Sequence, residues 1–510
     1  MIDKLRRLVR SRFFLGAVII LLEFSLLMGL FCWLSDAFWP VRVLGWVFYI
    51  VTLIYILNRD EIPEMKLPWV VIMMLLPIIG AFVFYLLSSN NASKDDYARF
   101  EKSAKKIRPH MLQTNNMEKL KAQDTDAYAQ ARYLYQSSKM PVFDKSKTTY
   151  YPLGEDFLKA LLEELSKARY FIFMEYFIIE DGKMWSAIYK VLRNKVKEGV
   201  EVFLLYDDLG CIATLDEEYY KELQSVGINC VPCNKFKPIL SHIHNNRDHR
   251  KITVVDGKVG FTGGVNLADE YINEKVKYGH WKDTAVKIEG EAVKNLSALF
   301  ISVWNMQNER QLDCDKYLNM TKGGDVGKGY VVPFGDSPSP IDTEDIGKTV
   351  YLNMINAARE YIYICTPYLI CDRELINAMC NAALRGVDVR IITPHIPDKK
   401  LVFRMTQSNY KKLVDSSVKV FEYTPGFIHA KSFVCDDKFA VCGTINLDYR
   451  SLVHHFECGA WMYDTECIVD MKNDFINTQN ISQAISKREA TLKMSDRVVA
   501  EILKVFSPLL

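Results

Sequence analysis

The sequence predicts an α/β protein in which two related domains follow a group of apolar N-terminal helices. Three observations lead to this fold class. Predicted helices and strands alternate from about residue 150 onward, the same pattern recurs about 180 residues later, and the first 87 residues contain three long apolar runs. Alternation of this kind is typical of βαβ units, in which helices cover the faces of a sheet. A repeat of this length indicates two domains rather than a solenoid of short repeats.

The apolar runs cover residues 13–34, 37–57 and 67–87, and Glu23 and Arg42 are their only charged residues. Each run has about 21 residues, enough for a helix to cross a hydrocarbon core of about 30 Å. A cleaved signal peptide would explain only the first run, and no small-residue cleavage site follows it. Residues 1–88 are therefore expected to anchor a multi-pass protein in the cell membrane through two or three transmembrane helices.

Two basic clusters bear on the number of crossings. One lies in residues 4–12, before the first run, and the other in residues 94–108, after the third. Both clusters favour the cytoplasmic side of a membrane. Three crossings would place them on opposite sides, whereas two crossings with one re-entrant or interfacial segment would place them on the same side. The sequence is compatible with either arrangement.

The remainder of the chain divides into three segments. Residues 89–145 are polar and are expected to form a helical tether outside the cores. Residues 146–322 and 323–510 are the two expected domains, and the second begins with a stretch rich in Gly, Pro and Asp. Each domain starts with the order helix, strand, helix, strand, which we expect at 153–169, 170–179, 184–199 and 200–208 and again at 349–360, 361–370, 373–386 and 387–393.

Each domain also contains a polar motif with the same internal spacing. Measured from a histidine, a lysine follows at +2, an aspartate at +7, a glycine at +14 and an asparagine at +17. A structural role for a single histidine is common, but it does not explain five residues repeated in register. The two sets are His249, Lys251, Asp256, Gly263 and Asn266, and His429, Lys431, Asp436, Gly443 and Asn446.

These residue types suit displacement at a phosphorus atom. On a strand, a histidine and a lysine two positions apart lie on the same face. Two such sets facing each other supply two lysines and two asparagines for phosphate oxygens, and one imidazole on each side of the phosphorus. One histidine then acts as nucleophile and the other as general acid and base. No metal and no cofactor are required, because the ammonium groups and amide donors offset the phosphate charge.

The two aspartates are less certain members of the site. We count Asp256 and Asp436 as candidate catalytic residues because they belong to the repeated motif. They also stand at strand ends directly before Gly257 and Asp437, where a role in a turn is equally consistent with the pattern.

The repeated H-x-K-x4-D motif closely resembles the signature of the phospholipase D superfamily. Within it the chain is most similar to bacterial cardiolipin synthases, through the segments NNRDHRKITVVDG, FTGGVNLADEYIN, GHWKDTAVKIEG, HAKSFVCD and GTINLDYRS. The resemblance implies two phospholipase D-like domains packed about a pseudo-twofold axis, with the active site at their interface. It also implies transfer of a phosphatidyl group from one phosphatidylglycerol to another through a phosphohistidine, which gives cardiolipin and glycerol.

The resemblance also implies roles for individual residues. His249 would be the nucleophile and His429 the general acid and base. Asp283 and Glu457 correspond to the carboxylates that orient the histidines, with Glu457 assigned to His429 and Asp283 to His249. His455 departs from the family pattern, because many relatives have Asn at this position, and this departure concerns the local hydrogen bonds.

Two other functions are compatible with the same motifs. A membrane-bound phospholipase D-type hydrolase or a nuclease would use water as the acceptor, and an inactive scaffold would keep only the fold. Both complete motifs argue against the scaffold, and a formal net charge of +2 argues against a nucleic-acid partner. The expected partners are therefore phosphatidylglycerol, other phospholipids and the lipid bilayer, without an obligatory protein partner.

Overall fold

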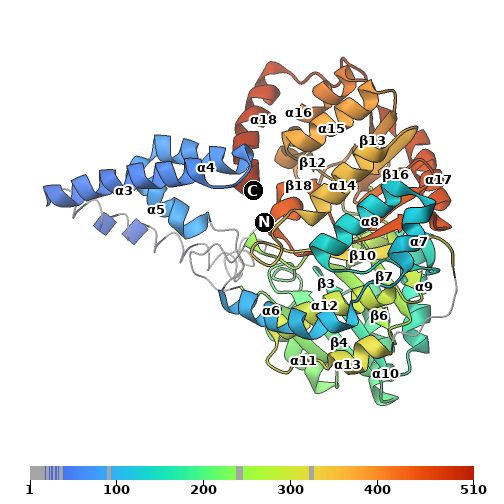
Figure 1. Ribbon diagram of the computed structural model, residues 1–510. Coiled ribbons are helices and arrows are strands. Elements are labelled where there is room, and N and C mark those ends of the chain that lie inside the picture. Colours follow the sequence, from blue (N-terminus) through green and yellow to red (C-terminus); the bar gives the residue numbers. More distant parts are fainter. Residues whose placement is uncertain are drawn as a thin grey trace.

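The computed structural model describes residues 38–88, 94–236, 245–320 and 327–509, together with a few single positions between 18 and 33. An apolar helical anchor projects from a larger body that contains two mixed β-sheets flanked by helices (Figure 1). Most of the apolar run 13–34 lies outside the described residues.

The first sheet has seven strands in the order β2-β9-β7-β6-β3-β4-β5. The strands β3, β4 and β5 run parallel to one another, and the remaining neighbours are antiparallel. The strand bounds are β2 Lys147–Tyr151, β3 Phe171–Tyr176, β4 Glu201–Asp207, β5 Asn229–Cys233, β6 Lys251–Val255, β7 Val259–Gly263 and β9 Ala285–Glu289.

The second sheet repeats this order as β10-β19-β17-β16-β11-β13-β14, with the short strands β1 and β20 added at its two edges. Here β11, β13 and β14 are the parallel strands. The predicted repeat is therefore confirmed strand by strand. The bounds are β1 Phe143–Asp144, β10 Tyr330–Asp336, β11 Tyr361–Cys365, β13 Asp388–Pro394, β14 Lys419–Tyr423, β16 Ser432–Cys435, β17 Phe439–Gly443, β19 Glu457–Tyr463 and β20 Gln483–Ala484.

Alternation along the strands gives each sheet two apolar faces. In β3, Ile172 and Met174 pack with the outer helices, whereas Phe171 and Phe173 join a core that continues into the second domain. The helices are α9 Gly154–Lys167, α10 Lys183–Lys197, α11 Tyr219–Ser225, α12 Val293–Gln307 and α13 Cys314–Asn319 in the first half, and α14 Ile346–Ala357, α15 Arg373–Leu384, α16 Lys400–Asp415, α17 Cys467–Asn480 and α18 Met494–Phe506 in the second.

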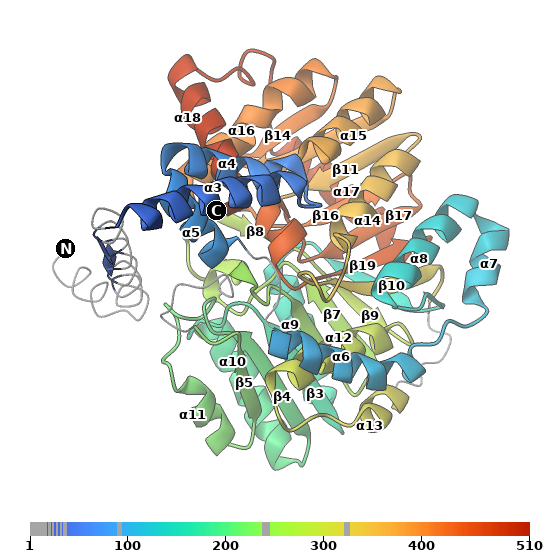
Figure 2. The same cartoon turned by 60° about the vertical axis from the view of Figure 1, so that its left-hand side comes forward.

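The segment 89–145 is helical as expected, but the prediction that it lies outside the cores is wrong. It forms α6 (Lys94–Ile107), α7 (Asn116–Gln123) and α8 (Thr125–Ser138), and Figure 2 shows α6 lying along α12. Ala127, Ala131 and Leu134 of α8 are buried in the core of the second domain. These three residues lie on one face of the helix. The polar residues on its other face dominate the composition of the segment, so the composition alone does not reveal the buried face.

In the anchor, one helix among the described residues is long and apolar enough to cross a membrane. This helix is α3 (Trp39–Asn58), with a mean hydropathy of 1.9, and it confirms the helix expected over 37–57. Only 17% of its apolar window is buried inside the protein. Its exposed apolar surface is what a lipid-facing helix requires.

The run 67–87 does not form one spanning helix, which is one of the alternatives that the sequence leaves open. The run is divided into α4 (Pro63–Leu75, 13 residues) and α5 (Pro77–Leu87, 11 residues). The break falls at Pro77, which cannot donate a backbone hydrogen bond and sterically disfavours a helical residue before it. The two helices pack closely at Gly80. A Cβ at this position would lie only 2.9 Å from the Cα of Met73. At 1.5 Å per residue neither helix spans about 30 Å.

Candidate active site

The two histidine motifs meet at one cavity between the domains. His249 stands just before β6 and His429 stands between β15 (Gly426–Ile428) and β16. Both imidazoles line a cavity of about 650 Å³, together with Asn266 and Asn446. The sequence prediction that both halves contribute to one site agrees with this placement.

Backbone hydrogen bonds tie each motif to the opposite domain. The N–H of His249 donates to the carbonyl of Phe456 at 2.9 Å, and the N–H of His429 donates to the carbonyl of Lys282 at 2.7 Å. On the second side β15 also pairs in parallel with β8 (His280–Lys282). Each histidine is therefore placed directly beside the segment that contains the other half's carboxylate.

The carboxylates consequently pair with the histidines in a crossed manner, which corrects the expected assignment. Nδ1 of His249 lies 2.9 Å from Oε1 of Glu457, and Nδ1 of His429 lies 2.6 Å from Oδ2 of Asp283. A carboxylate at Nδ1 holds the imidazole in one orientation and leaves Nε2 for chemistry at the cavity. The physical reason for the crossing is the pairing of chain segments between the domains.

The two carboxylates have different surroundings. Glu457 accepts hydrogen bonds from the hydroxyl groups of Thr444 and Ser451. Asp283 accepts the backbone N–H of Thr284 at 2.8 Å. A Cβ on Gly264, the counterpart of Thr444, would lie 2.1 Å from Oδ1 of Asp283, so only glycine leaves room for this carboxylate. The pseudo-symmetric site is therefore asymmetric in its hydrogen bonds.

Burial controls the protonation of the motif residues. It lowers the pKa of His249 and His429 well below the usual value, and the ammonium groups of the motif lysines lower it further. Burial also lowers the pKa of Lys251 to about 8 and that of Lys431 to about 7, and it raises the pKa of Asp283 to about 7. Burial thus favours the neutral imidazole, which is the form that a nucleophile requires, and the histidine that acts as the acid has to take up a proton before the leaving group departs.

A pH profile should reveal the two lysines. Because their pKa values are lowered to about 7 and about 8, their ammonium groups are lost as the pH rises through this range, and phosphate binding weakens. We expect kcat/KM to fall across that interval. The limb in kcat should lie at higher pH, because bound phosphate favours the charged lysines. Steady-state assays in buffered mixed micelles measure both limbs.

The matched control is Lys431→Arg, because a guanidinium keeps its proton in this range. In an active variant the alkaline limb of kcat/KM should move to higher pH. A wild-type kcat/KM that stays constant up to about pH 9 would contradict the assignment.

The two asparagines differ in their hydrogen bonds. Oδ1 of Asn266 accepts the N–H of Ile178 at 3.1 Å, and its Nδ2 donates to the hydroxyl of Tyr271 at 2.7 Å. By contrast, Oδ1 of Asn446 is buried without a hydrogen-bond partner in the described part of the chain. The side-chain oxygen of Asn446, unlike that of Asn266, therefore accepts no hydrogen bond from a described residue.

The structure does not place Asp256 and Asp436 at the cavity, which corrects their listing as catalytic residues. Each carboxylate accepts three backbone N–H groups at the start of a strand, within 2.7–2.9 Å. The donors are Arg169, Tyr170 and Phe171 for Asp256, and Arg359, Glu360 and Tyr361 for Asp436. Both aspartates have positive φ, of 54° and 53°. They hold a turn at the strand end opposite the lysine.

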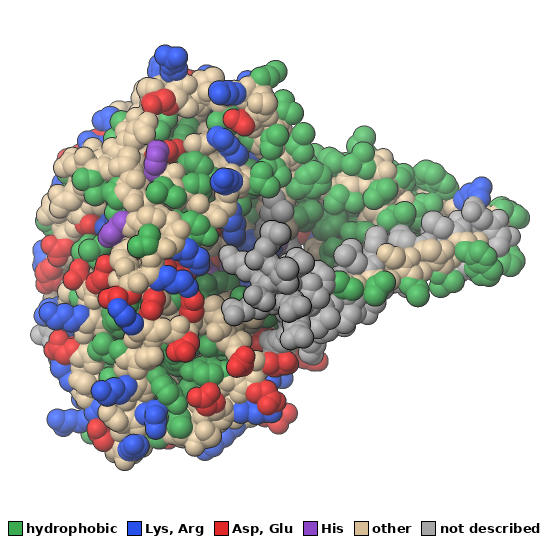
Figure 3. Space-filling view, turned by 180° about the vertical axis from the view of Figure 1, so that it is seen from behind, with side chains coloured by type: hydrophobic (Ala, Val, Ile, Leu, Met, Phe, Trp, Pro, Cys, Tyr) green, Lys and Arg blue, Asp and Glu red, His purple; other side chains and the backbone are tan. Residues whose placement is uncertain are grey.

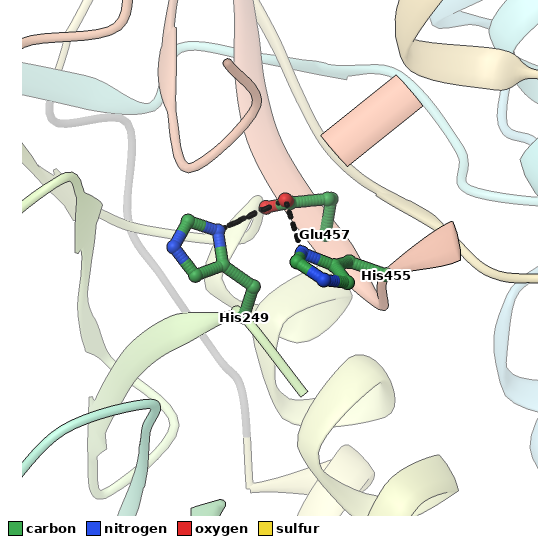
Figure 4. Close-up of side chains that lie close together, drawn as sticks. All are labelled: His249, His455 and Glu457. Carbon is green, nitrogen blue, oxygen red and sulfur yellow. Dashed lines mark hydrogen bonds and ion pairs between the residues drawn. The ribbon is translucent and has the colours of Figure 1, made fainter. Parts of the chain in front are cut away.

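His455 lies beside the first histidine pair. Figure 4 shows His249 and His455 directed toward the carboxylate of Glu457 from two sides. Nδ1 of His455 is 3.7 Å from Oε1 of Glu457, and burial lowers its pKa to about 3. One potential ligand atom from each of the three side chains lies within 4.8 Å of the other two. A cation bound there would compete with Nδ1 of His249 for the carboxylate, so it would oppose the proposed chemistry.

Sequence reasoning missed Arg247 and Asp207, which fix the backbone just before His249. Arg247, only 2% exposed, forms a buried ion pair with Asp207, whose Oδ1 lies 2.6 Å from the guanidinium. Oδ2 of Asp207 accepts the N–H of Asp248 at 3.0 Å, which fixes the backbone just before His249. The signal available in the sequence was an acidic strand end, YDD, because arginine is rarely buried without such a partner.

Aromatic side chains form part of the wall around the imidazoles. The ring of Phe177 contacts His249 at 5.0 Å, and the rings of Trp281 and Tyr271 each contact His429 at 5.5 Å between centroids. These residues limit the access of water to the histidines. Their types are common in any core, so the sequence alone offered no signal for them.

Comparison with known proteins supports the same reading. The family described as "Cardiolipin synthase, PLD-like domain" matches residues 161–304 and 351–478. A second family, described as "Phospholipase D-nuclease N-terminal", matches residues 47–88. The first match covers both histidine motifs and both orienting carboxylates.

Relatives align over most of the chain. A cardiolipin synthase of Alkalihalophilus pseudofirmus is 32% identical over 92% of this chain and 95% of its own length. An uncharacterized protein of Streptococcus mutans is 41% identical over 90% of this chain and 99% of its own length. Among solved structures, a phosphatidylserine synthase of Haemophilus influenzae has a TM-score of 0.56 at 13% identity, covering 76% of this chain and 98% of that one.

The solved structure supports the fold alone, because its sequence identity is low. The family match covers more than half of the chain, and it coincides with the two repeated domains and the shared cavity. This protein therefore belongs to the cardiolipin synthase family with phospholipase D-like domains.

Proposed function

We propose that this protein is a membrane-bound phosphatidyltransferase that converts two molecules of phosphatidylglycerol into cardiolipin and glycerol. The observation that carries the proposal is the crossed pair of oriented imidazoles at one cavity, each accompanied by a lysine. This arrangement supplies a nucleophile, an acid and base, and charge for one phosphodiester.

In the proposed reaction, Nε2 of His249 attacks the phosphorus of the first phosphatidylglycerol. The bond from phosphorus to the glycerol oxygen breaks, and His429, which enters this step protonated beside Asp283, gives a proton to the departing oxygen. A hydroxyl of the second phosphatidylglycerol then attacks the phosphohistidine while His429 takes its proton. The P–N bond breaks, cardiolipin forms, and both histidines return to their starting states.

The lining of the cavity supports an anionic lipid as the substrate. Its charged residues are Lys277, Lys399 and Arg450 together with the carboxylates Glu270, Asp398 and Asp448, and its apolar residues include Ile370, Val402, Met405, Phe427 and Tyr449. A lining that offers both cationic and apolar side chains suits a molecule with a phosphate headgroup and acyl chains. An apolar entrance also limits water, the competing acceptor.

We also propose that the anchor crosses the membrane twice, through residues 13–34 and α3, and that α4 and α5 form a re-entrant or interfacial hairpin. Two crossings place the basic clusters 4–12 and 94–108 on the same side, as the positive-inside rule favours. The catalytic body then lies on the cytoplasmic side, beside the Asn58 end of α3.

Product analysis distinguishes transfer from hydrolysis. Purified protein given phosphatidylglycerol in mixed micelles should form cardiolipin and free glycerol in equal amounts, as measured by lipid mass spectrometry and a glycerol assay. Phosphatidic acid with glycerol, and no cardiolipin, would identify a hydrolase instead. A His249→Ala preparation made in parallel controls for contaminating lipid enzymes.

A further inference from the structure

The C-terminal helix α18 carries an apolar stripe that no described residue covers. Met494 is 76% exposed, Val498 49%, Val499 44% and Ile502 56%. At 100° per residue, these four side chains occupy an arc of about 140° on one side of the helix. Such a stripe costs free energy in water and indicates a contact with apolar material.

The opposite side of α18 is packed firmly onto the catalytic body. Ala500 is fully buried, and Leu503 packs against a cluster that contains Ile370, Met405 and Tyr449. Asp496, on the same side of the helix, forms an ion pair with Arg404 of α16. The exposed stripe is therefore held in a fixed direction, away from the core.

The helix also lies at the rim of the catalytic cavity. Ile370, Met405 and Tyr449, which pack beneath Leu503, are themselves part of the cavity wall. These three residues therefore contact both the cluster beneath α18 and the space that the histidines line. Whatever the stripe contacts is consequently close to the entrance used by the substrate.

The location of α18 relative to the anchor indicates what covers the stripe. The chain after α18 contacts α4, and Leu509 packs against the anchor cluster of Ile56, Trp69 and Phe84. Figures 1 and 2 show α18 running crosswise to α3, on the face from which the anchor projects. Figure 3 shows hydrophobic side chains gathered on that part of the body, next to the base of the anchor.

We propose that α18 is a membrane-surface helix, which lies in the plane of the bilayer with its apolar stripe at the boundary between headgroups and acyl chains. A membrane crossed by α3 is perpendicular to that helix, so α18 is parallel to the membrane surface. The inference rests on the proposed function in one respect, the bilayer as the source of substrate. The contact would bring the rim of the cavity against the lipid from which phosphatidylglycerol enters.

Site-directed fluorescence tests the contact independently of activity. The eleven cysteines in the described part of the chain are buried, and Cys32→Ser removes the twelfth. In this background, Val498→Cys and Ile502→Cys are labelled with the environment-sensitive fluorophore NBD. The full chain is then reconstituted in vesicles of phosphatidylcholine and phosphatidylglycerol, with or without nitroxide-labelled lipid.

Both labels should show blue-shifted emission that the nitroxide lipid quenches by at least about twofold. Arg497→Cys, on the polar side of the same helix, is the matched control and should be quenched much less. A blue shift without lipid quenching would mean that protein covers the stripe, either residues 1–37 or a second copy, and would overturn the proposal. Emission typical of water at positions 498 and 502 would overturn it as well.

Activity gives a second measurement. The variant Val498→Glu with Ile502→Glu should lose at least about tenfold in turnover of vesicle phosphatidylglycerol, because two charges oppose insertion. It should keep its turnover of a short-chain phosphatidylglycerol that is supplied below its critical micelle concentration. Arg497→Glu should retain both activities. An equal loss on both substrates would show a damaged catalytic body, and an unchanged vesicle activity would contradict the role of the helix.

Failure of the proposed function would instead remove cardiolipin formation by the unmodified protein and leave the fluorescence result unaffected.

Discussion

Replacing either His249 or His429 with alanine should remove cardiolipin formation almost completely, with a loss of about 10⁴-fold or more in kcat. Each imidazole serves a step that the other cannot serve, because each is held by its own carboxylate on its own side of the cavity. Steady-state turnover of phosphatidylglycerol by the purified variants, with product detected by mass spectrometry, measures the loss.

The thermal unfolding midpoint separates an effect on chemistry from an effect on folding. The variants should retain the thermal unfolding midpoint of the unmodified protein to within a few degrees, because each substitution replaces a side chain at the cavity wall. Turnover by either variant within about tenfold of the unmodified protein would contradict a site shared between the two domains.

The second large effect should appear in trapping of the phosphohistidine. Given a phosphatidyl substrate with a good leaving group, His429→Ala should accumulate a phosphatidyl adduct on His249, because the first step no longer needs an acid and the second lacks its base. His249→Ala should form none. Peptide mass spectrometry after rapid acid-free quenching locates the adduct, and an adduct on His429 would reverse the two roles.

The crossed carboxylates extend this test. Asp283→Asn should resemble His429→Ala and retain the adduct longer, whereas Glu457→Gln, which keeps His249 but removes the carboxylate that orients it, should form the adduct slowly. Loss of an orienting carboxylate has large effects in comparable hydrogen-bonded histidines, about 10⁴-fold in one well-studied case. If Glu457→Gln were instead the variant that accumulated the adduct, the paired roles assigned here would be wrong.

Much of the site could be predicted from the sequence because the repeat made it visible. A single histidine and lysine on a strand would have had no special meaning, but the same spacing in both halves indicated one shared site. The strand order of the two sheets confirms the repeat, and both histidines line one cavity. The pairing of Asp283 with His429 could not be predicted, because it depends on β8 and β15 meeting between the domains, and residue spacing within one half does not encode that contact.

Other errors have similarly local causes. The composition of 89–145 concealed the inward faces of its helices, since alanine and leucine at helical spacing are diluted by exposed polar residues. Hydropathy over 67–87 counted apolar residues without regard to Pro77, which ends the helix in the middle of the run. For Asp256, the repeat correctly indicated an important residue, but the three backbone donors that explain it come from a distant segment.

The crossed pairs have a consequence for the ancestry of the chain. A half-length protein with one motif would contain a histidine and a carboxylate that belong to different pairs, so its imidazole would have no orienting partner. Two identical copies related by a twofold axis would complete both pairs at once, because each copy would supply the carboxylate for the other. A symmetric dimer is thus the smallest ancestor that could have been active before its halves were joined. Once they were joined, the two positions could diverge, and Gly264 beside Asp283 and Thr444 beside Glu457 record that divergence.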